Sequence, residues 1–277
     1  MFIHNTEINN ANIFRRSAPM AEHLLVDAQG PLLRVTIHRP EKRNALSRAV
    51  LNGLADVFTE QAADPRWKVV VLIGAGDKSF AAGGDLRDLA QVRSEEQATA
   101  MSHEARRALD AVSRFPVPVI AALNGDAIGG GAELAVACDF IIAPPTSRIG
   151  FIQGRLNITT AWGGGARLLS RLPAPLALRL LTRSELLDAH AAQRIGLIDH
   201  VAEAGQTLEQ CVEQFTKPML AQAPQVLRGF KALALSHADG LTKAELAKIE
   251  THHLVATWTH DDHWEAADKV LKTRKSS

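Results

Sequence analysis

The sequence predicts an α/β fold in which strands alternate with helices and pair in parallel. Two observations lead to this prediction. Short, continuous, β-branched runs occur at 68–76 (KVVVLIGAG) and 117–125 (VPVIAALNG), as is typical of strands covered on both faces. Helical patterns stand between such runs, and this alternation implies parallel strand pairing. From about Gly163 onward the pattern changes, because helical segments follow one another without convincing strands between most of them.

The elements can be assigned in chain order. Residues 31–40 (PLLRVTIHRP) alternate apolar and polar side chains, which indicates a strand with one exposed face. Residues 45–63 have helical periodicity, with Ser47 near the start of the helix. After the strand at 68–76, the pattern predicts a helix at 105–115, a strand at 117–125, a helix at 132–138 and a strand at 139–145. The later helical patterns cover 166–172, 176–183, 190–196, 208–215, 225–235, 244–258 and 263–275.

Composition and charge exclude several classes of protein. The chain has 277 residues, 46% of them hydrophobic and 22% charged, and its formal net charge is +1. This balance argues against binding to nucleic acid or to a membrane surface through bulk charge. No apolar segment approaches the ~18–20 residues of a membrane span. The two cysteines, Cys138 and Cys211, fit a reducing cytoplasm better than a disulfide-forming compartment.

The chain divides into three parts. Residues 1–19 lack the continuous apolar region of a secretory signal, and Arg15 and Arg16 alone are weak support for a mitochondrial presequence. Met20 is a plausible alternative start. We therefore expect a disordered extension over residues 1–19, a core over 20–205 and a C-terminal helical segment over 206–277.

Two glycine-rich turns each follow a buried strand, at 69–89 and at 119–134. Glycines that end a strand and open a helix let backbone N–H groups approach a ligand, and the helix dipole favours negative charge there. Two such turns can direct two N–H groups at one oxygen, as an oxyanion hole requires. Glu133 stands just inside the second helix, where a buried carboxylate is costly unless it has a role.

A nucleotide-binding interpretation of the first turn fails. Gly74 and Gly76 begin a dinucleotide pattern, but Ser79 stands where that pattern needs its third glycine. No Gly-Lys-Ser/Thr follows either, so a phosphate-binding loop is also excluded.

Four segments together carry a family resemblance: 38–46 (HRPEKRNAL), 80–86 (FAAGGDL), 124–140 (NGDAIGGGAELAVACDF) and 187–201 (LDAHAAQRIGLIDHV). In this order, the sequence resembles the crotonase (enoyl-CoA hydratase/isomerase) superfamily over roughly residues 22–275. The resemblance implies a spiral of repeated β-β-α units with a C-terminal helical trimerisation segment. It also implies a homotrimer or a dimer of trimers.

The resemblance assigns roles to the glycine turns. It implies that the backbone amides of Gly84 and Gly130 form the oxyanion hole, which polarises a thioester carbonyl and stabilises the enolate formed from it. Glu133 matches a catalytic carboxylate of the family. Tight strand–helix packing is the alternative explanation for the glycines, and a charge favoured by the helix dipole is the alternative for Glu133.

The same resemblance suggests how the substrate binds. Lys42 and Arg43 would meet the phosphates of coenzyme A, although a solvated surface pair is the alternative. The backbone around Ala81 and Ala82 would line the adenine pocket. Coenzyme A enters as part of an acyl-CoA thioester, so no separate cofactor is expected. The C-terminal histidines and aspartates match no strong ligand motif, and no metal site is predicted.

Two positions depart from the family pattern. Classical hydratases carry a second glutamate, and its position falls here on Gln153 in the segment 147–168 (SRIGFIQGRLNITTAWGGGARL). Glutamine can hold a water molecule or a substrate oxygen but cannot shuttle a proton at neutral pH. Trp162 resembles a tryptophan of some decarboxylases that act on malonyl-type thioesters, and core packing is its alternative role.

We therefore expect an acyl-CoA enzyme that stabilises a thioester enolate, of the enoyl-CoA hydratase/isomerase type. A decarboxylase of malonyl-CoA-type thioesters, such as methylmalonyl-CoA or ethylmalonyl-CoA, is the alternative enzyme. A non-catalytic scaffold or binding protein on the same fold is the alternative of another class. The intact glycine turns and Glu133 argue against the scaffold.

Overall fold

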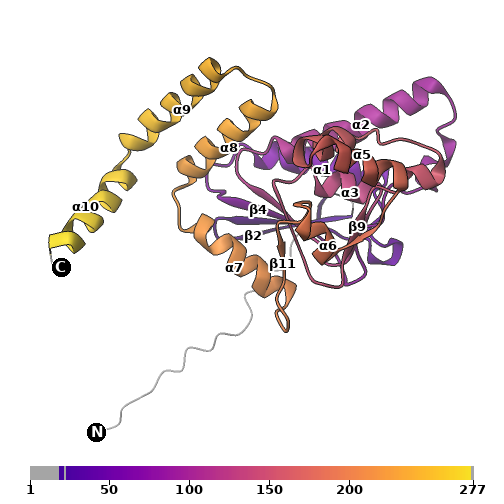
Figure 1. Ribbon diagram of the computed structural model, residues 1–277, viewed down its shortest axis with the longest axis horizontal. Coiled ribbons are helices and arrows are strands. Elements are labelled where there is room, and N and C mark those ends of the chain that lie inside the picture. Colours follow the sequence, from indigo (N-terminus) through magenta and orange to yellow (C-terminus); the bar gives the residue numbers. More distant parts are fainter. Residues whose placement is uncertain (1–18, 22, 276–277) are drawn as a thin grey trace, which may run out of the picture.

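The computed structural model describes residues 19–21 and 23–275 and has two β-sheets surrounded by helices (Figure 1). The expectation for residues 1–18 lies outside the described residues, and Pro19 opens the strand β1. The larger sheet contains, in spatial order, β1 (Pro19–Ala21), β2 (Leu24–Gln29), β3 (Leu32–Ile37), β4 (Val69–Gly74), β6 (Val119–Ala122), β8 (Phe140–Ala143) and β11 (His200–Val201). The smaller sheet contains β10 (Leu187–Asp188), β9 (Arg148–Gly150), β7 (Asp126–Ile128) and β5 (Ser79–Ala81).

The helices cover both sheets and then continue as a C-terminal series. They are α1 (Arg48–Gln61), α2 (Glu95–Ser113), α3 (Gly130–Ala135), α4 (Gly164–Arg171), α5 (Ala174–Arg183), α6 (Ala189–Arg194), α7 (Leu208–Leu220), α8 (Pro224–Ala238), α9 (Lys243–Trp258) and α10 (Asp261–Lys275). Ser47 caps α1 by accepting a hydrogen bond from the N–H of Val50. Each helical pattern identified after Gly163 coincides with one of these helices.

The central strands are buried on both faces, as their continuous apolar sequences predict. β3, β4, β6, β8 and β11 pair in parallel, whereas β1, β2 and β3 pair antiparallel. Val70 and Leu72 of β4 belong to the main core, which α1 and α2 also help to form. The alternate residues Val69 and Val71 pack in a second core that includes Cys211 of α7. The parallel α/β prediction is confirmed.

A strand of the large sheet, a short strand of the small sheet and a helix repeat in that order along the chain. The repeats are β4–β5–α2, β6–β7–α3 and β8–β9–α4, which confirms the β-β-α architecture. β5 and β7 are parallel, with Ala81 opposite Ala127, and β7 is parallel to β9. This pairing brings the ends of both glycine-rich turns to one place.

The sequence patterns missed some elements for physical reasons. β5, β7 and β9 have three residues each, too few to show a two-residue period beside their glycines. α2 begins at Glu95, ten residues before the pattern predicts, because its first turns are largely exposed and carry no apolar stripe. A capping box formed by Ser94 and Gln97 begins this helix instead.

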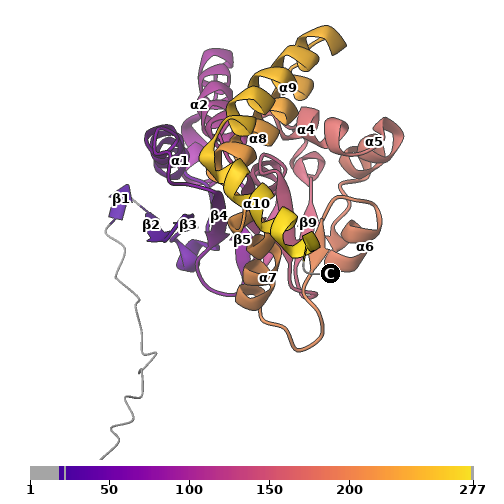
Figure 2. The ribbon, with the colours of Figure 1, turned by 90° about the vertical axis from the view of Figure 1, so that its left-hand side faces the viewer.

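The last helices extend away from the body of the molecule (Figure 1), and Figure 2 shows α9 and α10 in front of that body. Lys231 of α8 is buried and anchors the series, because its Nζ lies 2.5 and 2.6 Å from the two carboxylate oxygens of Asp139. α9 contains no buried residue. Large apolar side chains are exposed on α9 and α10: Leu254, Val255, Trp258, Trp264, Val270 and Leu271.

Cys138 and Cys211 are both buried free thiols, and burial raises the pKa of each. Within the described residues, no helix combines the length and apolar character needed to cross a membrane.

Candidate active site

The first glycine turn is held by the segment that precedes α1. The N–H of Leu46 donates to the carbonyl of Gly83 at 2.8 Å, and the N–H of Asp85 donates to the carbonyl of Leu46 at 3.0 Å. These bonds use the residues on either side of Gly84, so the N–H of Gly84 takes no part in this bridge. The segment 38–46 and the segment 80–86 are therefore brought together by backbone hydrogen bonds.

A partly buried ion pair reinforces this contact. Arg39 donates from Nη2 to Asp85 Oδ2 at 3.0 Å and from Nη1 to the carbonyl of Ala45 at 2.7 Å. Burial acts to raise the pKa of Asp85, but the hydrogen bonds from Arg39 and two backbone N–H groups outweigh it and hold that pKa below its usual value. The ion pair between Arg39 and the charged Asp85 therefore helps to hold the backbone next to Gly84 in place.

Sequence reasoning missed this pair and two asparagines that support the same turn. Asn44 Nδ2 donates to the carbonyl of Ser79 at 2.7 Å, and Asn124 Oδ1 accepts from the N–H of Gly74 at 2.9 Å. Asn44 and Asn124 lie inside the motifs 38–46 and 124–140, and this placement was the one sign in the sequence that they support the site. Buried polar residues beside a glycine turn need hydrogen-bond partners, and the turn backbone supplies them.

The second glycine turn leads directly into α3. Gly129 has φ +56°, in the left-handed region that favours glycine, and its carbonyl accepts the N–H of Glu133 at 3.0 Å. Gly130 is the first residue of α3, and the first N–H groups of a helix have no acceptor within the helix. A Cβ at Gly131 would lie 2.0 Å from the carbonyl oxygen of Ala81, so only glycine allows β5 and α3 to approach this closely.

The two turns meet at the positions that the resemblance assigns to the oxyanion hole. A Cβ at Gly83 would lie 3.1 Å from the carbonyl oxygen of Ile128 and 3.6 Å from the nitrogen of Gly130. The ring of Trp162 touches both turns, since its Cη2 would lie 3.2 Å from a Cβ at Gly84 and 2.8 Å from one at Gly130. The structure therefore places Gly84 and Gly130 close together, both against the ring of Trp162.

Glu133 lies buried beside them, with only 2% of its surface exposed. Its Oε2 accepts the N–H groups of Gly164 at 2.8 Å and Trp162 at 3.1 Å, and its Oε1 accepts Gln153 Nε2 at 2.9 Å. A Cβ at Gly164 would lie 2.3 Å from Glu133 Cγ, so the start of α4 must be glycine here. Burial raises the pKa of Glu133, and these hydrogen bonds offset part of that effect.

Gln153 occupies the position at which the family pattern has a second glutamate. It opens the 3₁₀ helix η3 (Gln153–Leu156) and is 9% exposed. Its Oε1 is buried and has no hydrogen-bond partner within the described residues. The side chain therefore binds Glu133 with its donor and retains an unused acceptor, which is an unusual state for a buried amide.

The residues predicted to bind coenzyme A lie beside the first turn. Lys42 ends the 3₁₀ helix η1 (Pro40–Lys42), and Lys42 and Arg43 are both exposed. The carbonyl of Arg43 accepts the N–H of Ala82 at 3.1 Å, whereas Ala81 is buried in β5. These four residues therefore form one neighbourhood with Gly84, although their contact with a substrate remains a prediction.

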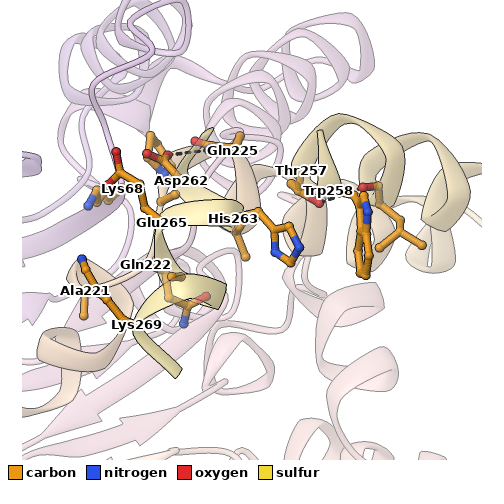
Figure 3. A pocket seen from close by; sticks show the side chains of 15 residues that line it. Lys68, Ala221, Gln222, Gln225, Thr257, Trp258, Asp262, His263, Glu265 and Lys269 are labelled. Carbon is orange, nitrogen blue, oxygen red and sulfur yellow. Dashed lines mark hydrogen bonds between the residues drawn. The ribbon is translucent and has the colours of Figure 1, made fainter. Parts of the chain in front are cut away.

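A separate pocket lies near the C-terminal helices (Figure 3). Lys68, Gln222, Trp258, Asp262 and Lys269 are among the residues that line it. Within the lining, Gln225 donates from Nε2 to Asp262 Oδ2 at 2.8 Å. The pocket contains none of the predicted site residues. Across the described part of the chain, no group of three or more His, Cys, Asp or Glu side chains is placed to hold a metal ion.

Comparison with known proteins gives a consistent result. The family model described as enoyl-CoA hydratase/isomerase matches residues 27–277. The chain is 32% identical over 249 residues to the enoyl-CoA isomerase/hydratase fer4 of Mycosarcoma maydis, with 87% of this chain and 90% of that protein covered. It is 33% identical to the crotonyl-CoA hydratase of Syntrophomonas wolfei, with 77% and 81% covered. The crystal structure of an enoyl-CoA hydratase from Bacillus anthracis superposes with a TM-score of 0.84 at 28% identity, covering 91% of this chain and 97% of that one.

Proposed function

The chain belongs to the enoyl-CoA hydratase/isomerase family of the crotonase superfamily, and from this premise we propose that it stabilises a thioester enolate between Gly84 and Gly130. The observation that carries the proposal is the buried carboxylate of Glu133 beside two glycine turns that β5 and β7 join. A buried carboxylate with a raised pKa, placed near backbone N–H groups, suits proton transfer next to a thioester carbonyl. Coenzyme A enters as part of the substrate, and this chemistry needs no separate cofactor.

The proposed chemistry divides between the three residues. The N–H groups of Gly84 and Gly130 bind the thioester oxygen and stabilise the negative charge that develops on it. Glu133 accepts or returns the proton at the carbon next to the carbonyl. Each carboxylate oxygen has two acceptor sites, so Glu133 Oε1 can bind Gln153 and still meet a water molecule or a substrate proton.

Within this chemistry we place hydration or isomerisation of an enoyl-CoA first. The unpartnered Oε1 of Gln153 supports it, because this buried acceptor can hold a water molecule beside Glu133. Glu133 would take a proton from that water as its oxygen bonds to one alkene carbon, and would return the proton to the carbon next to the carbonyl. The names of the relatives, a crotonyl-CoA hydratase and an isomerase/hydratase, agree with this assignment.

Decarboxylation of a malonyl-type thioester is the second candidate. It is favoured by the neutral amide of Gln153, which leaves Glu133 without a second carboxylate at the family position. The oxyanion hole would hold the enolate that remains when CO2 departs, and any acid could then quench it. This reaction needs less proton-transfer machinery than hydration does.

A screen of acyl-CoA thioesters by mass spectrometry tests the proposed function. Gain of the mass of water supports hydration, and loss of the mass of CO2 supports decarboxylation. A product of unchanged mass with a shifted double bond supports isomerisation. A rise in melting temperature without turnover would favour a non-catalytic binding protein instead, and no melting shift with any thioester would reject acyl-CoA as the ligand.

Replacing Gln153 by glutamate is expected to separate the two enzymes. In a hydratase, Gln153→Glu supplies the second carboxylate and should raise the rate of crotonyl-CoA hydration. In a decarboxylase it places a second negative charge near the substrate carboxylate and should depress CO2 release from methylmalonyl-CoA. Two carboxylates this close titrate together, so the pH profile should also gain a second step with a raised pKa. Gln193→Glu on α6 adds the same charge elsewhere and serves as the control.

We also propose that the chain forms a homotrimer or a dimer of trimers in the cytoplasm. The exposed apolar side chains of α9 and α10 support the assembly, since exposed apolar patches of this kind mark association surfaces. Trp258→Glu should therefore lower the sedimentation mass toward that of one chain. Leu178→Glu on α5, another exposed apolar residue, should leave the mass unchanged. A wild-type protein that sediments as a monomer would refute the assembly.

A further inference from the structure

Trp162 contacts every part of the proposed machinery. Its backbone N–H donates to Glu133 Oε2 at 3.1 Å, while its indole ring lies against both glycine turns. Only 6% of its surface is exposed, so the ring is held within the structure and is not free to rotate into solvent. A single rigid side chain thus joins two turns that are 46 positions apart in the sequence.

The contacts involve the outer atoms of the indole. A Cβ at Gly130 would lie 2.3 Å from Cζ3, 2.8 Å from Cη2 and 2.9 Å from Cε3 of Trp162. A Cβ at Gly84 would lie 3.2 Å from Cη2 and 3.4 Å from Cζ2. The ring edge farthest from the Trp162 backbone therefore fills the space in front of both glycines. Any side chain at Gly130 would overlap it.

Each turn is also held by its own neighbours. Leu46 and the ion pair of Arg39 with Asp85 fix the turn at Gly84, and the first turn of α3 fixes Gly130. The strand pairing between the turns ends at Ala81 and Ala127. Beyond that pair, the turns also approach each other directly at Gly83 and Gly131, and the indole adds a contact with both Gly84 and Gly130.

We propose that Trp162 is a positioning residue that sets the relative placement of the Gly84 and Gly130 N–H groups. The inference rests on the proposed function, because it assigns Trp162 a purpose within the oxyanion hole. An oxyanion hole requires donors about 2.7–3.1 Å from the developing negative charge. A misplacement of about 1 Å can lower the rate ~10²-fold, so a spacer between the two donors acts on turnover and not on affinity for coenzyme A.

Trp162→Phe tests the proposal because the smaller ring lacks the outer indole atoms that touch the glycines. We expect kcat to fall about 10²-fold, with KM changed no more than about threefold and the binding of free coenzyme A unchanged. Trp67→Phe is the matched control. Trp67 is also buried, but it precedes β4 and so lies at the end of that strand opposite to the glycine turn.

The absorption spectrum of a bound thioester probe measures directly how strongly the oxyanion hole polarises the carbonyl. The absorption band of a conjugated thioester probe, 2,4-hexadienoyl-CoA, moves to longer wavelength when its carbonyl is polarised. The wild-type protein and Trp67→Phe should produce this shift on binding the probe, and Trp162→Phe should produce a smaller one. A loss of packing alone would lower stability without changing the spectrum of bound probe.

A double variant gives a second, independent test of the proposal. The methyl group of Gly130→Ala overlaps the indole in the wild-type background but refills part of the vacated space when residue 162 is Phe. The loss in kcat of Gly130→Ala with Trp162→Phe should therefore be smaller than the product of the two single losses. Multiplicative losses, or a Trp162→Phe variant with wild-type kcat and wild-type spectral shift, would overturn the inference. A wild-type protein that neither binds nor polarises the probe would instead reject the proposed function.

Discussion

Glu133→Gln should lower turnover about 10²–10⁴-fold, the usual contribution of a positioned acid or base, and leave the affinity for coenzyme A nearly unchanged. The amide has the size of the carboxylate but cannot accept a proton from the carbon next to the thioester. Steady-state kinetics on the substrate found by the thioester screen provide the measurement. Turnover within a few-fold of the wild-type rate would reject Glu133 as the principal proton-transfer group.

The surroundings of Glu133 predict that this variant folds. An amide oxygen at residue 133 can still accept the N–H groups of Trp162 and Gly164. Its new NH₂ group would face Gln153, whose unpartnered Oε1 can turn to accept it. The amide–amide contact is thus kept with its direction reversed, and Gln153 Nε2 gives up its bond to residue 133. Glu213→Gln, on the exposed side of α7, removes a carboxylate far from these contacts and serves as the control.

The raised pKa of Glu133 sets the pH dependence of the wild-type rate. Glu133 must be ionised to accept a proton, so kcat should fall as the pH drops through a pKa above the ordinary value of a glutamate, about 4.3. Glu133→Gln should lose this acidic limb. If kcat of the variant still falls at low pH as in the wild type, the titrating group is not Glu133.

The raised pKa of Glu133 also predicts how stability depends on pH: the free energy of unfolding should fall as the pH rises, whereas the rate should increase. Because the pKa of Glu133 is higher in the folded chain than in the unfolded chain, the folded chain binds the proton more tightly. The free energy of unfolding therefore falls as the pH rises between the unfolded and the folded pKa values. Thermal unfolding of Glu133→Gln should lack this fall, so the inactive variant should gain stability relative to the wild type as the pH rises through that window.

The sequence predicted the parts of the fold that depend on local pattern. Strands such as β4 and β6 are buried on both faces, so their apolar runs are continuous and easy to recognise. The glycine turns were equally visible, because both end such strands and lead toward helices. The short strands β5 and β7 carry no period of their own, and only their pairing in space defines them.

The contacts within the site could not be predicted in the same way. Gln153 and Glu133 are twenty positions apart, and Arg39 and Asp85 are separated by 46. No local period connects such pairs, since they meet only after the sheets have formed. From the sequence alone, Trp162 could have either of two roles, substrate binding or core packing. Its ring is buried against Gly84 and Gly130, a contact that no spacing in the sequence indicates.

Gly130→Ala is expected to lower kcat about 10²–10³-fold, the range found when one donor of an oxyanion hole is lost. The backbone N–H remains in the variant, but the added Cβ would lie 2.3 Å from Cζ3 of Trp162. Either the ring or the start of α3 must move. The N–H of residue 130 would then no longer point at the thioester oxygen. Such overpacking should also lower the free energy of unfolding by about 1–3 kcal/mol.

Gly84→Ala provides a graded comparison for this prediction. Its Cβ would meet Leu89 Cδ1 at 3.1 Å, a contact that the flexible leucine can relieve, and Trp162 Cη2 at 3.2 Å, which is far less severe than the 2.3 Å overlap at Gly130. Its loss in kcat should therefore be smaller than that of Gly130→Ala. Gly229→Ala on α8 meets His253 Cβ at 3.1 Å and should keep turnover near that of the wild type. Equal losses at positions 130 and 229 would show that packing strain alone lowers the rate, and would remove Gly130 from the oxyanion hole.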